Sequence, residues 1–240
     1  MTKTPRTSTA TRNALRRDPR ALARLISAIE DGNPSARPVM KSLFPLTGAA
    51  HVIGVTGPLG VGKSSLINLL VRLLRERQVR VAVVAVDPSS PFSGGSVLGD
   101  RIRIERDPRD DGVFFRSMAS RGHAGGVAAA TREVVRVLDA IGFGVVLVET
   151  VGSGQVDVEI REIASTNIVV LVPHLGDEVQ TLKAGLFEIA DVFAINKSDL
   201  PGADLAERDL AEFASLGPGP DGWRPRVVRT STLAPAGTDR

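Results

Sequence analysis

A glycine-rich stretch, Gly57 to Ser65, is the first group of residues that could do chemistry. Its first eight residues match the pattern G-x-x-x-x-G-K-[ST], in which glycines let backbone N–H groups turn toward phosphates. Lys63 would reach the terminal phosphates, and the Ser64 hydroxyl could bind Mg²⁺. The stretch follows an apolar segment and opens a helical pattern, the context that this motif requires. We therefore predict a nucleotide-phosphate site formed by Gly57, Pro58, Leu59, Gly60, Val61, Gly62, Lys63, Ser64 and Ser65.

A second motif, Asn196-Lys197-Ser198-Asp199, stands at the end of another apolar segment and matches the pattern N-K-x-D. The Asp199 carboxylate could accept hydrogen bonds from N1–H and the 2-amino group of guanine. Adenine has neither donor, so a buried carboxylate facing it would lose a few kcal/mol, on the order of an unmade hydrogen bond. Ser231 and Thr232 follow the last predicted strand and could offer backbone N–H groups to the guanine carbonyl. The expected ligands are GTP and GDP.

Three carboxylates, Asp87, Asp100 and Glu149, end or follow predicted strands. Parallel sheets bind ligands at the carboxyl ends of their strands, so all three could face one site. With Ser64 they offer the oxygen ligands that Mg²⁺ prefers. We assign Lys63, Asp100 and Glu149 to catalysis, since phosphoryl transfer needs charge stabilisation and an oriented water. The alternative for each carboxylate is a helix cap or a turn.

The elements that must position these residues alternate between apolar strands and amphipathic helices. This alternation predicts an α/β fold of the P-loop NTPase type, a mostly parallel sheet with helices on both faces. The expected strands are residues 52–56, 79–86, 112–116, 144–149, 168–172, 192–196 and 226–230. The expected helices are residues 21–29, 63–77, 126–141, 157–165, 179–190 and 205–216.

Composition narrows the class of protein. The 240 residues include no cysteine, which excludes disulfides and thiolate metal sites. No apolar run approaches the roughly 20 residues of a membrane span. Residues 1–20 hold six basic side chains against one acidic one, and the rest lacks the charge of a nucleic-acid binder. We expect a cytoplasmic protein with a basic flexible tail (1–18), an N-terminal helical extension (19–50), a GTPase domain (51–232) and a short C-terminal tail (233–240).

Several motifs together resemble those of the MeaB/ArgK-type GTPases. Besides the phosphate loop they are Val86-Asp87-Pro88-Ser89-Ser90, Gly94-Gly95-Ser96-Val97-Leu98-Gly99-Asp100-Arg101, Arg121-Gly122-His123-Ala124-Gly125-Gly126, Val148-Glu149-Thr150-Val151-Gly152-Ser153-Gly154-Gln155 and Gly176-Asp177-Glu178-Val179-Gln180. The resemblance implies a metallochaperone-class G protein. It places acidic residues around Mg²⁺ and the hydrolytic water at Asp87, Asp100 and Glu149, and the guanine reader at Asn196, Lys197 and Asp199.

The resemblance also implies a partner, a cobalamin-dependent acyl-CoA mutase such as methylmalonyl-CoA mutase. Members of the family continue past residue 232 into a dimerisation arm that this sequence does not contain, so we expect a monomer or a weak dimer. Other functions stay open. One is a module that binds GTP as a conformational ligand with negligible hydrolysis. Another is a nickel-enzyme maturation GTPase, disfavoured by the absent cysteines, and a third is an ATP-dependent kinase, disfavoured by Asn196–Asp199.

Overall fold

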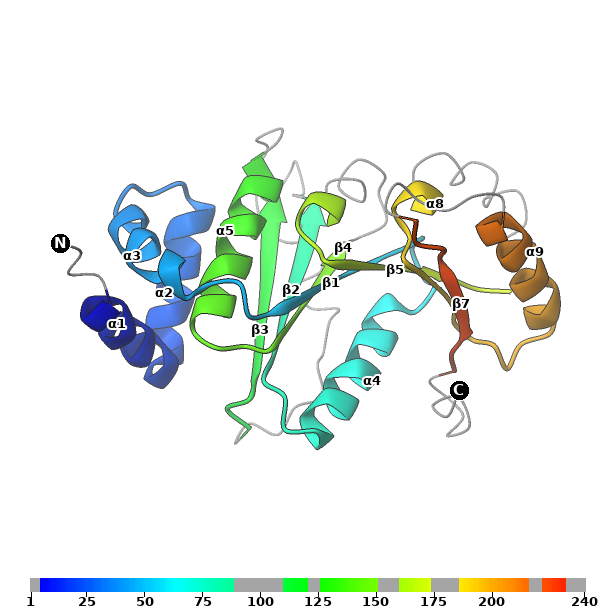
Figure 1. Ribbon diagram of the computed structural model, residues 1–240, viewed down its shortest axis with the longest axis horizontal. Helices are drawn as coiled ribbons and strands as arrows, with labels where there is room; N and C mark the ends of the chain where they lie inside the picture. The colour runs from blue at the N-terminus through cyan, green and yellow to red at the C-terminus, as the bar shows by residue number, and fades with distance from the viewer. Residues whose placement is uncertain are drawn as a thin grey trace. The chain divides into compact units, whose positions relative to one another are not determined.

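The computed structural model describes residues 5–88, 110–120, 126–150, 160–173, 186–215 and 222–231. The described strands follow the order β3-β2 in one part of the chain and β4-β1-β5-β6-β7 in the other (Figure 1). The chain divides into two compact units, one made of residues 1–52 and 74–146 and the other of residues 53–73 and 147–240. The predicted α/β fold class, a parallel sheet with helices, is confirmed.

The second unit contains the parallel strands that lead to the predicted site. Strand β5 pairs with β1 on one side and with β6 on the other, and β6 pairs with β7. Val55, Val169 and Phe193 are fully buried, because both faces of a parallel sheet are covered. The strands are β1 (His51–Thr56), β4 (Val145–Thr150), β5 (Thr166–Leu171), β6 (Val192–Ile195) and β7 (Arg226–Arg229). The helices are α4 (Lys63–Glu76), η2 (Ile160–Glu162), α8 (Leu186–Ile189) and α9 (Ala203–Ser215).

The first unit joins a two-strand parallel pair to a group of helices. Strand β2 (Val81–Pro88) pairs with β3 (Val113–Ser120), and α5 (Gly126–Ala140) packs on both. Two helices, α2 (Pro19–Glu30) and α3 (Ala36–Leu43), pack against α5, and α1 (Pro5–Arg17) packs against α2 and α3 (Figure 1). The short η1 (Phe44–Leu46) follows α3. None of the described helices is both long enough and apolar enough to cross a membrane.

The expectation of a flexible tail is wrong for residues 5–17, which form helix α1. This helix contacts α2 and α3, and Ser8 is only 1% exposed within it. Asp18 then caps α2, where its carboxylate accepts hydrogen bonds from the amides of Arg20 and Ala21. The basic composition suggested a solvated tail, but packing against neighbouring helices stabilises a helix that composition alone does not reveal.

The predicted helix over residues 157–165 is wrong for its described part. Residues 160–162 form a single 3₁₀ turn, and strand β5 begins at Thr166. The amides of Ile163 and Ala164 both bond to the carbonyl of Ile160, so the turn closes on itself instead of continuing. Residues 157–159 lie outside the described residues.

Asp139, near the end of α5, holds the segment that leads into β1. Its carboxylate accepts hydrogen bonds from three consecutive backbone amides, at 2.5 Å from Gly48, 3.2 Å from Ala49 and 2.9 Å from Ala50. Hydrogen bonds to a charged acceptor are stronger than neutral ones. One side chain therefore fixes the connection between η1 and β1 against α5.

We predict that Asp139→Ala lowers the free energy of unfolding by about 2 kcal/mol, because three amides lose a charged acceptor at a partly exposed position. Asp139→Asn keeps one acceptor oxygen and should lose less. Urea denaturation measures both variants. Asp209→Ala, an exposed aspartate on α9, is the control and should change stability by less than about 0.5 kcal/mol. Equal effects of Asp139→Ala and Asp209→Ala would contradict this role.

Candidate nucleotide-binding site

The predicted phosphate loop connects the end of β1 to the start of α4, as the motif requires. Gly57, Gly60 and Gly62 adopt positive φ values of 138°, 82° and 95°, a region that favours glycine. A Cβ atom at Gly57 would lie 2.2 Å from the carbonyl oxygen of Val170, so only glycine fits against β5 there. Loop and helix start thus provide the geometry that binds phosphates in proteins.

Four carbonyl groups of the loop accept hydrogen bonds from three side chains. Lys63 Nζ donates to Gly57 O at 2.7 Å and to Pro58 O at 2.9 Å. The other two donors come from the N-K-x-D motif. Asn196 Nδ2 donates to Val61 O at 2.8 Å, and Lys197 Nζ donates to Gly60 O at 3.0 Å.

These carbonyl bonds also determine where the loop amides point. The described peptide bonds include no cis bond, and in a trans peptide the N–H points away from the preceding carbonyl. The amides that follow the bonded carbonyls of Gly60 and Val61 are therefore directed away from Lys197 and Asn196. This leaves them oriented as donors for an anion.

Asn196 links the phosphate loop to the last strand. Its side chain is buried, and its Oδ1 accepts a hydrogen bond from Thr230 Oγ1 at 3.2 Å while its Nδ2 donates to the loop. Both ends of the amide are thus satisfied. The next residue, Lys197, has a positive φ of 55°, an uncommon conformation for a residue with a side chain and one that concentrates at functional sites.

Asp199 receives a hydrogen bond from Ser231, whose Oγ donates to Asp199 Oδ1 at 2.6 Å. We predicted a backbone N–H from Ser231 to the base, and this stays a prediction. What the structure shows is a contact of its hydroxyl with the Asp199 carboxylate. Thr232 lies outside the described residues. The Asp199 carboxylate is therefore held in place by a neighbouring side chain.

Glu149 is buried at the end of β4, with 5% of its surface exposed. Its Oε1 accepts a hydrogen bond from Ser64 Oγ at 2.8 Å, whereas Oε2 is buried and has no hydrogen-bond partner among the residues that the structure describes. Burial raises the pKa of Glu149 above its usual value of 4.5, and the Ser64 hydrogen bond and the charge of Lys63 act in the opposite direction. The carboxylate is held at an energetic cost.

Two of the predicted metal ligands, Ser64 and Glu149, are therefore in direct contact. A hydroxyl beside a carboxylate with a buried, unpartnered oxygen is a donor set that fits a hard, oxygen-loving cation such as Mg²⁺. Asp87 stands in β2 opposite Ala119, and its backbone alone is described. Asp100 lies outside the described residues. Leu59 and Ser65 of the phosphate loop are exposed.

Two threonines that the sequence did not single out lie in the same unit. Thr150 Oγ1 donates to Thr56 Oγ1 at 2.9 Å, and both residues are buried. Thr56 directly precedes the phosphate loop and Thr150 directly follows Glu149, so the bond joins the strand ends that carry both. In the sequence, the only sign of these threonines is that each stands next to a predicted site residue. Their hydrogen bond can be recognised only in the folded chain, where the two strands bring the side chains together.

A parallel sheet, a glycine-rich loop opening a helix, and an N-K-x-D motif bonded to that loop define a P-loop GTPase. The comparisons with known proteins agree. The family model described as "Methylmalonyl Co-A mutase-associated GTPase MeaB" matches residues 22–240. This chain belongs to that family, as the motif resemblance predicted, and it is a GTPase.

Individual relatives show the same likeness. A protein of Pyrococcus abyssi in the GTPase class is 52% identical over 221 residues, which cover 89% of this chain and 67% of the relative. The GTPase ArgK of Escherichia coli is 37% identical over 94% of this chain and 71% of its own length. A crystal structure of an LAO/AO transport system kinase superposes with a TM-score of 0.73 at 29% identity, covering 95% of this chain and 70% of that one. The chain thus spans about two thirds of the length of these relatives.

We predict that Gly62→Ala destabilises the nucleotide-free protein by about 2 kcal/mol more than Gly60→Ala does. Both glycines have positive φ, so backbone strain is shared by the two variants. The added Cβ would lie 2.3 Å from Asn196 Nδ2 at position 62 but meets nothing within 4 Å at position 60. Thermal unfolding without nucleotide compares them, and equal losses would show that Asn196 moves aside freely.

We also predict a pH signature for Glu149. Since the folded protein holds this proton more tightly than the unfolded chain, the contribution of Glu149 to stability falls as pH rises above about 4.5, the ordinary pKa of a glutamate side chain. Glu149→Gln lacks this penalty. In chelator without nucleotide, the variant should gain thermal stability over the wild type as pH rises above about 4.5, and the gain should level off once the Glu149 carboxyl of the folded wild type has ionised. A stability difference that does not change with pH would contradict the prediction.

Proposed function

We propose that this GTPase assists a cobalamin-dependent acyl-CoA mutase such as methylmalonyl-CoA mutase, and that GTP hydrolysis gates the loading or protection of the mutase cofactor. The observation that supports the partner is the family match over residues 22–240, because the description of that family names the mutase. The site supports the part of the proposal that concerns GTP, because the phosphate loop, the N-K-x-D motif and the buried carboxylate of Glu149 lie in the same unit of the chain.

We assign the phosphate-binding role to the loop from Gly57 to Ser65 and the recognition of guanine to Asn196, Lys197 and Asp199, with Ser231 and Thr232 beside them. Mg²⁺ would be held by Ser64, Asp87, Asp100 and Glu149. When bound, the ion neutralises charge on the phosphates of GTP.

The chain's own groups supply the rest of the proposed chemistry. Lys63 places a positive charge against the loop carbonyls next to the expected phosphates, where charge develops during transfer. The unpartnered Oε2 of Glu149 can accept a hydrogen bond from a water and orient it for attack on the terminal phosphate. Asp100 is proposed to act with Glu149 at this step.

We predict that Asp199→Asn weakens GTP binding by roughly 1–3 kcal/mol, because an amide cannot accept both guanine donors. The variant should gain affinity for xanthosine triphosphate relative to the wild type. Calorimetry with both nucleotides measures the change in preference. Asp204→Asn, an exposed aspartate on α9, is the matched control and should bind GTP as the wild type does. ATP binding as tight as GTP binding in the wild type would refute guanine recognition.

The experiment that tests the partner is GTP hydrolysis by the purified chain with and without the methylmalonyl-CoA mutase of the same organism. We expect the mutase to bind and to change the rate of phosphate release. Lys63→Ala is the control, since it should bind the mutase but hydrolyse little GTP in either condition. A mutase that neither binds nor alters hydrolysis would refute the proposed function, whereas binding without hydrolysis would favour the conformational-module alternative.

A further inference from the structure

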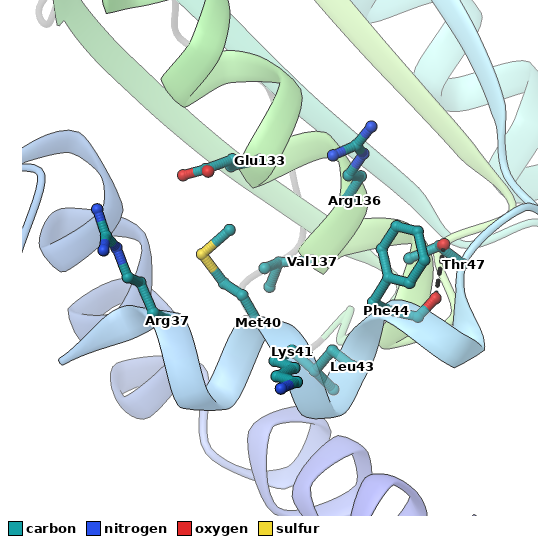
Figure 2. Close-up of a pocket in the computed structure, with 9 residues that line it drawn as sticks. All are labelled: Arg37, Met40, Lys41, Leu43, Phe44, Thr47, Glu133, Arg136 and Val137. Carbon is teal, nitrogen blue, oxygen red and sulfur yellow. Dashed lines mark hydrogen bonds between the residues drawn. The ribbon is translucent and has the colours of Figure 1, made fainter. Parts of the chain in front are cut away.

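A groove of about 300 Å³ lies between two helices of the first unit, far in sequence from the nucleotide motifs (Figure 2). One wall is α3 with η1, and the other is α5. The lining residues are Arg37, Met40, Lys41, Leu43, Phe44, Thr47, Glu133, Arg136 and Val137. Four of those on α3 and η1, namely Arg37, Met40, Lys41 and Phe44, recur at helical spacing, and the three on α5 do so as well.

The groove has an apolar floor with an exposed aromatic at its edge. Leu43 and Val137 are almost fully buried at its base, and Figure 2 shows the Met40 side chain directed into the space between the helices. Phe44 is 61% exposed, which is unusual for so large an apolar side chain beside an apolar hollow. A partner that covered Phe44 would gain apolar burial worth about 25 cal/mol per Å².

Charge at the rim is predominantly positive. Arg37, Lys41 and Arg136 are exposed cations, and Glu133 is the one carboxylate among the lining residues. The Arg136 guanidinium lies 5.8 Å from the centre of the Phe44 ring, so one cation is held against the aromatic edge. Aromatic residues, methionine and arginine are the side chains enriched in protein interfaces.

The groove is also held in shape without an occupant. Thr47 donates a hydrogen bond from Oγ1 to the Phe44 carbonyl at 2.9 Å, drawn as the dashed line in Figure 2, and its amide donates to the same oxygen. The next three amides, at Gly48 to Ala50, are bound by Asp139 of α5. Both walls are thereby tied together, and a preformed surface costs less to bind.

We propose that this groove docks an acidic amphipathic helix on the surface of the mutase, a proposal that rests on the function proposed above. Two helices with an apolar floor between them can accept a third helix through the apolar face of that helix. The three rim cations select a helix whose flanks carry carboxylates. Phe44 and Met40 make the central contacts, and Arg37, Lys41 and Arg136 steer the encounter.

The test measures binding of the purified mutase to the wild type and to two kinds of variant, by biolayer interferometry at two salt concentrations. Phe44→Ala should weaken binding by about 10-fold or more. Its matched control is Leu205→Ala, a side chain 59% exposed on α9. Arg37→Glu combined with Lys41→Glu should slow association and reduce its salt dependence, with the exposed Arg208→Glu as control.

Basal GTP hydrolysis and thermal stability report whether each variant is folded. If Phe44→Ala does not fold, the charge variants carry the test, because Arg37 and Lys41 are exposed. If the wild type binds the mutase and the groove variants bind it with affinities within about twofold of the wild type, the inference is overturned and the proposed function still stands. No wild-type binding would overturn both. Self-association of the wild type that Phe44→Ala abolishes would show that a second copy occupies the groove, which also overturns the inference.

Discussion

The nucleotide site depends on one constraint, which is that the carbonyls of the phosphate loop must face the protein so that its amides can face a phosphate. Lys63, Asn196 and Lys197 satisfy this constraint by donating to four loop carbonyls. The Asn196–Asp199 motif, which we propose as the guanine reader, is thus also a structural support of the phosphate loop. Positive φ at the loop glycines is the geometric consequence, since residues with a Cβ would be strained or would collide.

Glu149 lowers the stability of the folded protein at a position where the proposed function needs a hydrogen-bond acceptor. A buried carboxylate with one bonded and one unpartnered oxygen is costly in a protein interior, and the rise of its pKa expresses that cost. Burial in a low-dielectric environment also makes this oxygen a strong acceptor for any donor that reaches it. Stability given up at this position is therefore consistent with a demand for a ready acceptor next to Ser64 and Lys63.

The N-terminal helices are attached by specific polar contacts as well as by apolar packing. Arg116 of β3 pairs with Glu30 of α2 and also donates to Ser27 at 3.0 Å, and the Glu30 side chain is only 6% exposed. A desolvated ion pair adds little net stability but penalises every other register of α2. This anchor and the Asp139 bonds fix different ends of the same helical group. The Asp139 bonds hold the segment after η1 against α5, and so help to keep the two walls of the groove in place.

The sequence by itself determined the chemistry of this protein, because phosphate and guanine binding need residue types at fixed short spacings. The loop from Gly57 to Ser65 and the motif from Asn196 to Asp199 were predictable for that reason, and so was the alternation of strands and helices. Tertiary structure decided what depends on contacts between distant residues. Examples are the hydrogen bond from Ser231 to Asp199, the support of Asn196 by Thr230, and the helix over residues 5–17. None of these has a local pattern, since their stability comes from partners that only the folded chain brings within reach.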